Sequence, residues 1–88
     1  MYSLVIEARR DADEDPWPDA TPEEYLNSTA MVLLVDNLPD PRDVFFVRFA
    51  VDTADQTVAF RSADHELMTR LRHVLSEIPE LRVVSATI

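Results

Sequence analysis

The chain contains no glycine in its 88 residues, and this absence restricts both its turns and its sites. Glycine adopts positive φ without steric cost and allows a backbone to approach a ligand closely. Glycine-rich phosphate loops, dinucleotide-binding turns and nucleophile elbows are therefore excluded. Two-residue hairpin turns are disfavoured for the same reason, so we expect longer loops built on Asp, Asn and Pro.

The composition predicts one cytoplasmic domain over residues 1–88. Hydrophobic residues make up 47% of the chain, as in globular proteins. Cysteine is absent, which excludes disulfides and thiolate chemistry and is consistent with a reducing compartment. The N-terminal residues have no positive charge before their apolar stretch, so they do not resemble a secretory signal. The apolar run Ala30–Val35 is far shorter than the ~20 residues that cross a bilayer.

The charge is strongly negative and concentrated in one segment. The net charge is −9, and seven of the 17 acidic residues lie between Asp11 and Glu24. Binding to nucleic acid or to an anionic membrane depends on cationic contacts, so we expect neither partner. A basic protein surface would be attracted instead. A lysine-free acidic composition is also typical of GC-rich genomes and of salt-adapted hosts.

Sequence patterns predict a mixture of strands and helices. Thr21, Pro22 and Glu24 form a capping-box signature that begins a helix. A second helix is predicted over Ala63–Ile78, with Ser62 as its cap and one apolar stripe at helical spacing. Strands are predicted at residues 2–8, 44–52, 57–61 and 82–88.

The segment Ala30–Asp36 is ambiguous between a continuation of the first helix and a further strand. Its residues Met31–Val35 are apolar on every side of a helical wheel, whereas a helix in a small domain should have a polar face. A short apolar run that ends in a turn sequence suits a buried strand. We therefore favour the strand slightly.

Both alternatives give an α+β fold with two layers. The sheet would have four or five mainly antiparallel strands, with two helices on one face. If Ala30–Asp36 is helical, the order is the β-α-β-β-α-β of a ferredoxin-like sandwich, and otherwise the fold is a close variant of it.

The predicted strand Val44–Asp52 is apolar on both faces. Val44, Phe46, Arg48 and Ala50 would share the face that the helices leave open. Phe46 and Arg48, together with Arg61 and Glu7, make that face a candidate interface for self-association or for a partner. The alternative is that the long loop covers Phe46.

Residues 9–20 are predicted to form an acidic loop with Trp17 at its centre. Pro16 and Pro18 flank Trp17 and exclude regular structure around it. Tryptophan is a common interface anchor, so Trp17 docks either on its own domain or on a partner. With the sheet face included, the partner-binding candidates are Asp13, Glu14, Asp15, Trp17, Asp19, Phe46 and Arg48.

The remaining polar residues do not indicate a catalytic site, a metal site or a cofactor. His65 and His73 are eight residues apart on one helix, too far apart to share a metal ion. Asp36, Asp40 and Asp43 lie in a proline-containing turn, where aspartate is common.

These observations predict a small acidic protein-binding or regulatory module without enzymatic activity. It would act through the open sheet face or the Trp17 loop on a protein partner with a basic surface. The alternative is an acidic mimic of nucleic acid that inhibits a nuclease or a DNA-binding protein, as immunity, antitoxin and phage counter-defence proteins do.

Overall fold

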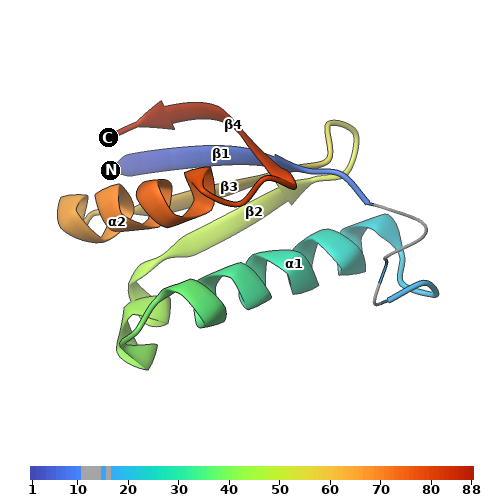
Figure 1. Ribbon diagram of the computed structural model, residues 1–88, viewed down its shortest axis with the longest axis horizontal. Coiled ribbons are helices and arrows are strands. Elements are labelled where there is room, and N and C mark those ends of the chain that lie inside the picture. Colours follow the sequence, from blue (N-terminus) through green and yellow to red (C-terminus); the bar gives the residue numbers. More distant parts are fainter. Residues whose placement is uncertain (11–14, 16) are drawn as a thin grey trace.

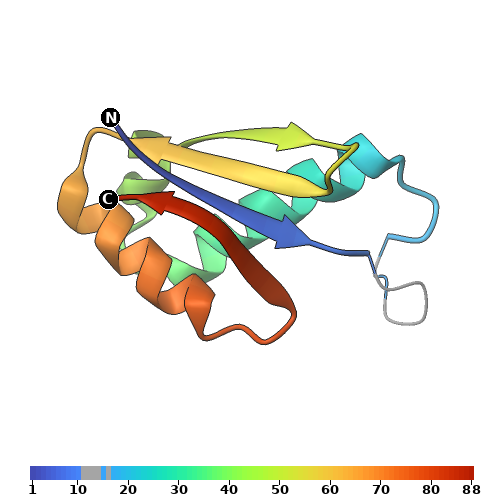
Figure 2. The same ribbon diagram turned by 90° about the horizontal axis from the view of Figure 1, so that it is seen from above.

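A four-stranded antiparallel sheet carries two helices on one face (Figures 1 and 2). The computed structural model describes residues 1–10, 15 and 17–88. The elements along the chain are β1 (Tyr2–Ala8), α1 (Pro22–Asn37), the 3-10 helix η1 (Pro41–Phe46), β2 (Arg48–Asp52), β3 (Thr57–Ser62), α2 (His65–Ser76) and β4 (Leu81–Thr87).

The strands lie in the order β2-β3-β1-β4, and every neighbouring pair is antiparallel. This arrangement confirms the predicted two-layer α+β sandwich. It is a close variant of the ferredoxin-like fold, from which it differs by the insertion of η1 between α1 and β2.

The core lies between the sheet and the two helices. Alternate residues of the central strands point into it, such as Leu4 and Ile6 of β1 and Phe60 of β3, all fully buried. Helix α1 packs mainly against β2 and β3, and α2 packs against β4, β1 and β3. The buried hydrophobic residues form one cluster across these elements.

The prediction of a strand at Ala30–Asp36 is wrong, because the first helix continues to Asn37. The predicted capping box is confirmed: the Glu24 backbone N–H donates to the Thr21 hydroxyl at 3.2 Å, and the Glu24 carboxylate accepts from the Thr21 backbone N–H at 3.1 Å. Leu26, Ala30 and Leu34 face the core at helical spacing. The expectation of a polar outer face failed, because apolar side chains remain exposed there.

The predicted strand Val44–Asp52 is too long at its start. Pro41 begins η1, and Val44, Phe45 and Phe46 belong to that helix. The strand β2 begins at Arg48, after which the predicted alternation holds, with Phe49 packed against the core. Phe46 therefore does not lie on the sheet, and its predicted place on the open face beside Arg48 is wrong.

The second helix is shorter than predicted and has a different cap. Helix α2 begins at His65, and the Asp64 carboxylate accepts from the Leu67 backbone N–H at 3.1 Å. Ser62 instead accepts from the Asp64 backbone N–H at 3.1 Å. In the loop after β2, Gln56 takes the positive φ of 56° that a glycine would adopt more readily.

Candidate functional site

The most exposed apolar surface of the described residues lies where the end of α1 meets η1. On η1, Phe45 is 86% exposed and Phe46 is 64% exposed. On α1, Val35 is 58% exposed, and Met31 and Val32 are each 42% exposed. We call these five residues the α1–η1 patch. Among the described residues, only Met1 and Val84 are other large hydrophobic side chains with comparable exposure.

The geometry of η1 explains why two neighbouring phenylalanines face outward. A 3-10 helix has three residues per turn, so only one side chain in three can face the core. Val44 takes that place and packs against the core cluster. Phe45 and Phe46 occupy the other two sides of the turn, and no residue of η1 is buried.

A groove runs between the two elements of the patch. Met31 and Val35 of α1 form one side, and Phe45 of η1 forms the other. The residues that complete it are Leu38, Pro39, Pro41 and Val44. The groove is therefore lined without exception by apolar side chains, and its prolines restrict the backbone that connects α1 to η1.

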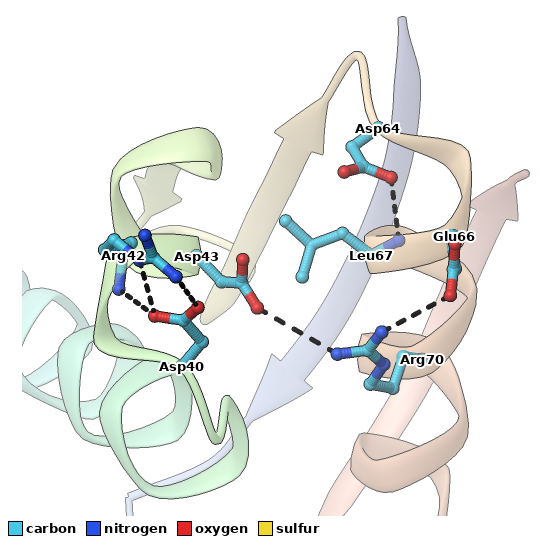
Figure 3. Close-up of polar contacts among 7 residues, drawn as sticks. All are labelled: Asp40, Arg42, Asp43, Asp64, Glu66, Leu67 and Arg70. Carbon is cyan, nitrogen blue, oxygen red and sulfur yellow. Dashed lines mark hydrogen bonds and ion pairs between the residues drawn. The ribbon is translucent and has the colours of Figure 1, made fainter.

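Carboxylates and arginines hold η1 in place (Figure 3). Asp40 caps η1 by accepting from the Arg42 backbone N–H at 2.9 Å, and it also accepts from the Arg42 guanidinium at 3.2 and 3.0 Å. On the facing helix, Arg70 lies 3.9 Å from Asp43 and 3.5 Å from Glu66. These contacts connect η1 to α2, although such exposed pairs contribute little stability individually.

Two carboxylates lie at the margin of the patch, and Arg42 compensates one of them. The guanidinium and backbone N–H of Arg42 hold the pKa of Asp40 below its usual value. Asp36 is exposed on α1, one residue beyond Val35. The aspartates of the predicted turn thus cap a helix, form an ion pair or face solvent.

The acidic segment is anchored by Arg10. Its guanidinium forms an ion pair with Asp15 and donates to the backbone carbonyls of Trp17 at 2.6 Å and of Ala20 at 2.9 Å. The same guanidinium lies 5.0 Å above the ring centre of Tyr25, a cation–π distance. The described part of this segment is therefore attached to the first turns of α1.

Trp17 docks on its own domain. Its ring is half-buried and meets Tyr25 edge-on, with 6.1 Å between the ring centres. Asp19 is exposed, whereas Asp13 and Glu14 lie outside the described residues. The structure thus separates the predicted candidates into the Trp17 segment at the start of α1, Phe46 on η1 and Arg48 on the open sheet face.

The two histidines lie on the outer side of α2. His65 meets Tyr2 edge-on at 4.9 Å between ring centres. His73 Nε2 lies 3.4 Å from a Glu77 carboxylate oxygen, and both side chains are more than two-thirds exposed. This pair lies on an open helix surface, beside an open depression lined by His65, Glu66, Thr69, Arg70 and His73.

Of the five patch residues, only Phe46 was predicted from the sequence as a partner-binding residue, whereas Met31, Val32, Val35 and Phe45 were not. The signal was present, because Met31–Val35 is apolar around the whole helical wheel. Such a helix in a small domain cannot bury every side chain, so a helical assignment implied an exposed apolar surface.

Comparison of the chain with protein-family models, curated proteins and solved structures gave no match. No helix within the described part of the chain has the length and hydrophobicity needed to cross a membrane.

Proposed function

We propose that this protein is a small acidic binding module, without enzymatic activity, that recognises a protein partner through the α1–η1 patch. The observation that carries the proposal is the exposure of Phe45 and Phe46, 86% and 64%, beside the exposed Val35. A buried aromatic side chain contributes 150–250 Å² of contact area. Adjacent exposed aromatics on an ordered helix are therefore typical of an interface rather than of a solvated surface.

The partner should present an apolar projection with basic side chains around it. The groove between Met31, Val35 and Phe45 would receive the apolar group. The exposed Asp36 at the margin, together with the net charge of −9, favours a partner with positive charge outside that contact. Charge would accelerate association, and burial of the phenylalanines would provide most of the affinity.

The same features weigh against a mimic of nucleic acid as the main function. A mimic would present closely spaced carboxylates to a basic cleft, and its affinity would fall steeply as salt increases. The α1–η1 patch is apolar, so its affinity should depend only moderately on salt. Salt dependence therefore distinguishes the two functions.

The test compares the double variant Phe45→Asp/Phe46→Asp with the control Val84→Asp. Val84 is also an exposed apolar residue, 49% exposed, but it lies on β4 in the sheet. All three side chains are exposed, so unfolding free energies should change by only about 0.5 kcal/mol. A partner captured from the host would be purified and titrated calorimetrically against each variant.

We expect the double variant to bind at least ~30-fold more weakly, the effect of losing one hot-spot residue, and Val84→Asp to bind as the unaltered chain does. Equal binding by the double variant would refute the patch as the site. A fall in affinity of more than ~1,000-fold between 50 and 200 mM salt would favour the mimic instead. If the patch variant instead dissolved a homodimer, the occupant would be a second copy, and the proposal would be wrong.

A further inference from the structure

The sheet face opposite the helices carries an ordered pattern of charge. Strand register places its side chains in three rows across β2, β3, β1 and β4. The first row is Arg48, Arg61, Ser3 and Thr87. The middle row is Ala50, Ala59, Val5 and Ser85, and the last row is Asp52, Thr57, Glu7 and Arg82. One end of the face is therefore basic, the centre has mainly small side chains, and the other end contains two carboxylates and Arg82.

The basic end lacks a compensating charge within the described chain. Arg48 and Arg61 are directly opposite each other on β2 and β3, and both are exposed. Within residues 1–10, 15 and 17–88, neither has a carboxylate within 4.0 Å. Like charges directly opposite on neighbouring strands are destabilising, so this pair has a cost that an external anion would relieve.

At the other end, Asp52 keeps one carboxylate oxygen available. Its Oδ1 accepts from the backbone N–H groups of Ala54 and Asp55 at 3.0 and 3.3 Å. Glu7 is better compensated, because it accepts from Arg9 at 3.1 Å and from Arg82 at 3.2 Å. Asp52 is thus the exposed anion of this row that has no arginine bonded to it among the described residues.

We propose that the open sheet face binds a second copy of this chain, with a two-fold axis that lies between the sheets and runs across the strands. This axis reverses the strand direction of one copy relative to the other, so the row with Arg48 and Arg61 in each copy meets the row with Asp52 and Glu7 in the other. Arg48 then faces Asp52 of the second copy, on the same β2 edge. An axis along the strands would instead place Arg48 against Thr87 and Arg61 against Ser3 of the second copy, with all four arginines at one end of the interface and no carboxylate opposite them.

The middle row suits such contact because it lies on the axis. Each residue there faces its own counterpart, and Ala50, Ala59 and Ser85 are short enough for two sheets to approach at ~10 Å or less. A bulge in β4 between the partners of Val5 and Ile6 adds Val84, which is 49% exposed, to the contact surface. Both helices lie on the other side of each sheet, so the axis leaves them accessible (Figure 2).

The size of the face predicts weak association. Four strands ~4.8 Å apart and five residues at ~3.4 Å give a flat footprint on the order of 300 Å² per copy. Side chains increase this area, but stable interfaces bury about 800 Å² per partner. We therefore expect a dimer with a dissociation constant in the micromolar range or weaker, and with a clear dependence on salt.

The test uses the residue on the axis, Ala59, in two variants of opposite charge. Ala59→Glu and Ala59→Arg each place a charge against its own copy, so each variant alone should dissociate at least ~10-fold more readily than the unaltered chain. An equimolar mixture places Glu against Arg and should restore association to at least the unaltered level. Sedimentation equilibrium would follow the mass between 10.1 kDa and twice that value. Circular dichroism of each variant would verify that the strand still forms.

A second pair of variants tests the orientation of the axis. Arg48→Asp alone should weaken the dimer, and its mixture with Asp52→Arg should restore it, because each copy then offers the charge that the other lacks. Loss of the Asp52 cap weakens the hairpin loop, so the fold of Asp52→Arg is verified first, and Arg48→Asp/Arg61→Asp gives the same loss without that change. A chain that remains at 10.1 kDa up to millimolar concentration would overturn the inference. Rescue by Ala59 mixtures but not by the charge exchange would overturn the stated axis.

This inference is independent of the proposed function. Phe45→Asp/Phe46→Asp should leave the dimer intact, and Ala59→Glu should leave binding at one α1–η1 patch intact. If both hold, the dimer carries two patches facing away from each other, and a partner with two sites would bind with increased avidity.

Discussion

Helices α1 and α2 pack on the same face of one sheet, but their solvent-facing sides differ in polarity. On α2, the buried residues Leu67, Met68, Leu71 and Leu75 form one stripe, and the outer side carries charged and polar residues. On α1, Leu34 is fully buried, but Met31 and Val35 on the outer side are exposed. The first helix therefore has an apolar side that its own domain does not cover.

This difference indicates what each helix does. The pattern of α2 is explained by folding alone, because its apolar residues are those that the core requires. The pattern of α1 exceeds that requirement, and its excess lies beside two exposed phenylalanines of η1. An apolar surplus confined to one side of one helix is the physical basis of the interface that we propose at α1 and η1.

The largest expected change in stability comes from truncating one core leucine in each helix, which compares how much the two helices contribute to the core. Leu34→Ala in α1 and Leu71→Ala in α2 each remove a fully buried side chain. Each should lower the free energy of unfolding by about 2–5 kcal/mol, through lost burial and the cavity left behind. For a domain of this size, whose total stability is roughly 4–13 kcal/mol, either loss is severe. Urea denaturation measures both.

Neighbouring residues provide the controls. Val35→Ala, one residue after Leu34, removes an exposed side chain and should change stability by about 0.5 kcal/mol or less. Arg72→Ala serves the same purpose on α2. If Val35→Ala costs as much as Leu34→Ala, the outer side of α1 is covered in solution, and the contrast between the helices disappears.

Much of the fold could be predicted from the sequence because local signals agreed with tertiary demands. Strand β1 and helix α2 have apolar periods of two and of about 3.6 residues, and both elements formed close to their predicted places. The Thr21–Glu24 capping box also formed as predicted. At these positions one structure satisfies both the backbone and the core.

The site was less predictable because there the sequence departs from the requirements of folding. The rule that a helix needs a polar face led to a strand for Ala30–Asp36, whereas the apolar outer face is what remains exposed. The apolar and aromatic run that begins at Val44 suggested a strand, but Asp40 and Pro41 begin a 3-10 helix there. The capping and turn residues thus prevailed over the strand preference of the run, and Phe46 was placed on the wrong surface.

Removal of the N-cap side chain of each helix should cause an intermediate loss of stability and compares how the two helices begin. Thr21→Ala removes the hydroxyl that accepts from Glu24, and Asp64→Ala removes the carboxylate that accepts from Leu67. Each should cost about 1 kcal/mol in unfolding free energy. We expect the Asp64 change to cost slightly more, because a carboxylate also interacts with the positive end of the helix dipole. Thermal or urea denaturation measures both.

The conservative variants Thr21→Ser and Asp64→Asn keep an acceptor oxygen and should recover most of the loss. A cost below ~0.3 kcal/mol for Thr21→Ala would mean that packing alone determines the start of α1. In that case the capping box would have no energetic role, and the two helices would differ at their starts as well as on their outer sides.

The smallest expected effect is on the contact between Trp17 and the start of α1. Helix α2 has no comparable segment docked on it among the described residues. Burial raises the pKa of Asp15, whereas the Arg10 guanidinium and the Trp17 backbone N–H lower it. Together these two contacts outweigh burial, so the pKa of Asp15 lies below the usual 3.8. A lowered folded-state pKa means that the contact stabilises the docked segment above pH 3.8 and is lost as pH falls through the lowered value. Trp17 is the only tryptophan, so its fluorescence reports this step directly.

We expect Trp17 emission to shift to longer wavelength in acid, as its ring leaves Tyr25 and becomes hydrated, before helical circular dichroism is lost. Asp15→Asn should remove the acid step and give the shifted emission already at neutral pH, because it cannot form the ion pair with Arg10. Asp19→Asn alters an exposed carboxylate of the same segment and should leave the step unchanged. A Trp17 transition that coincides with unfolding of both helices would show that the segment has no separate equilibrium, because undocking alone exposes Trp17 without disturbing α2.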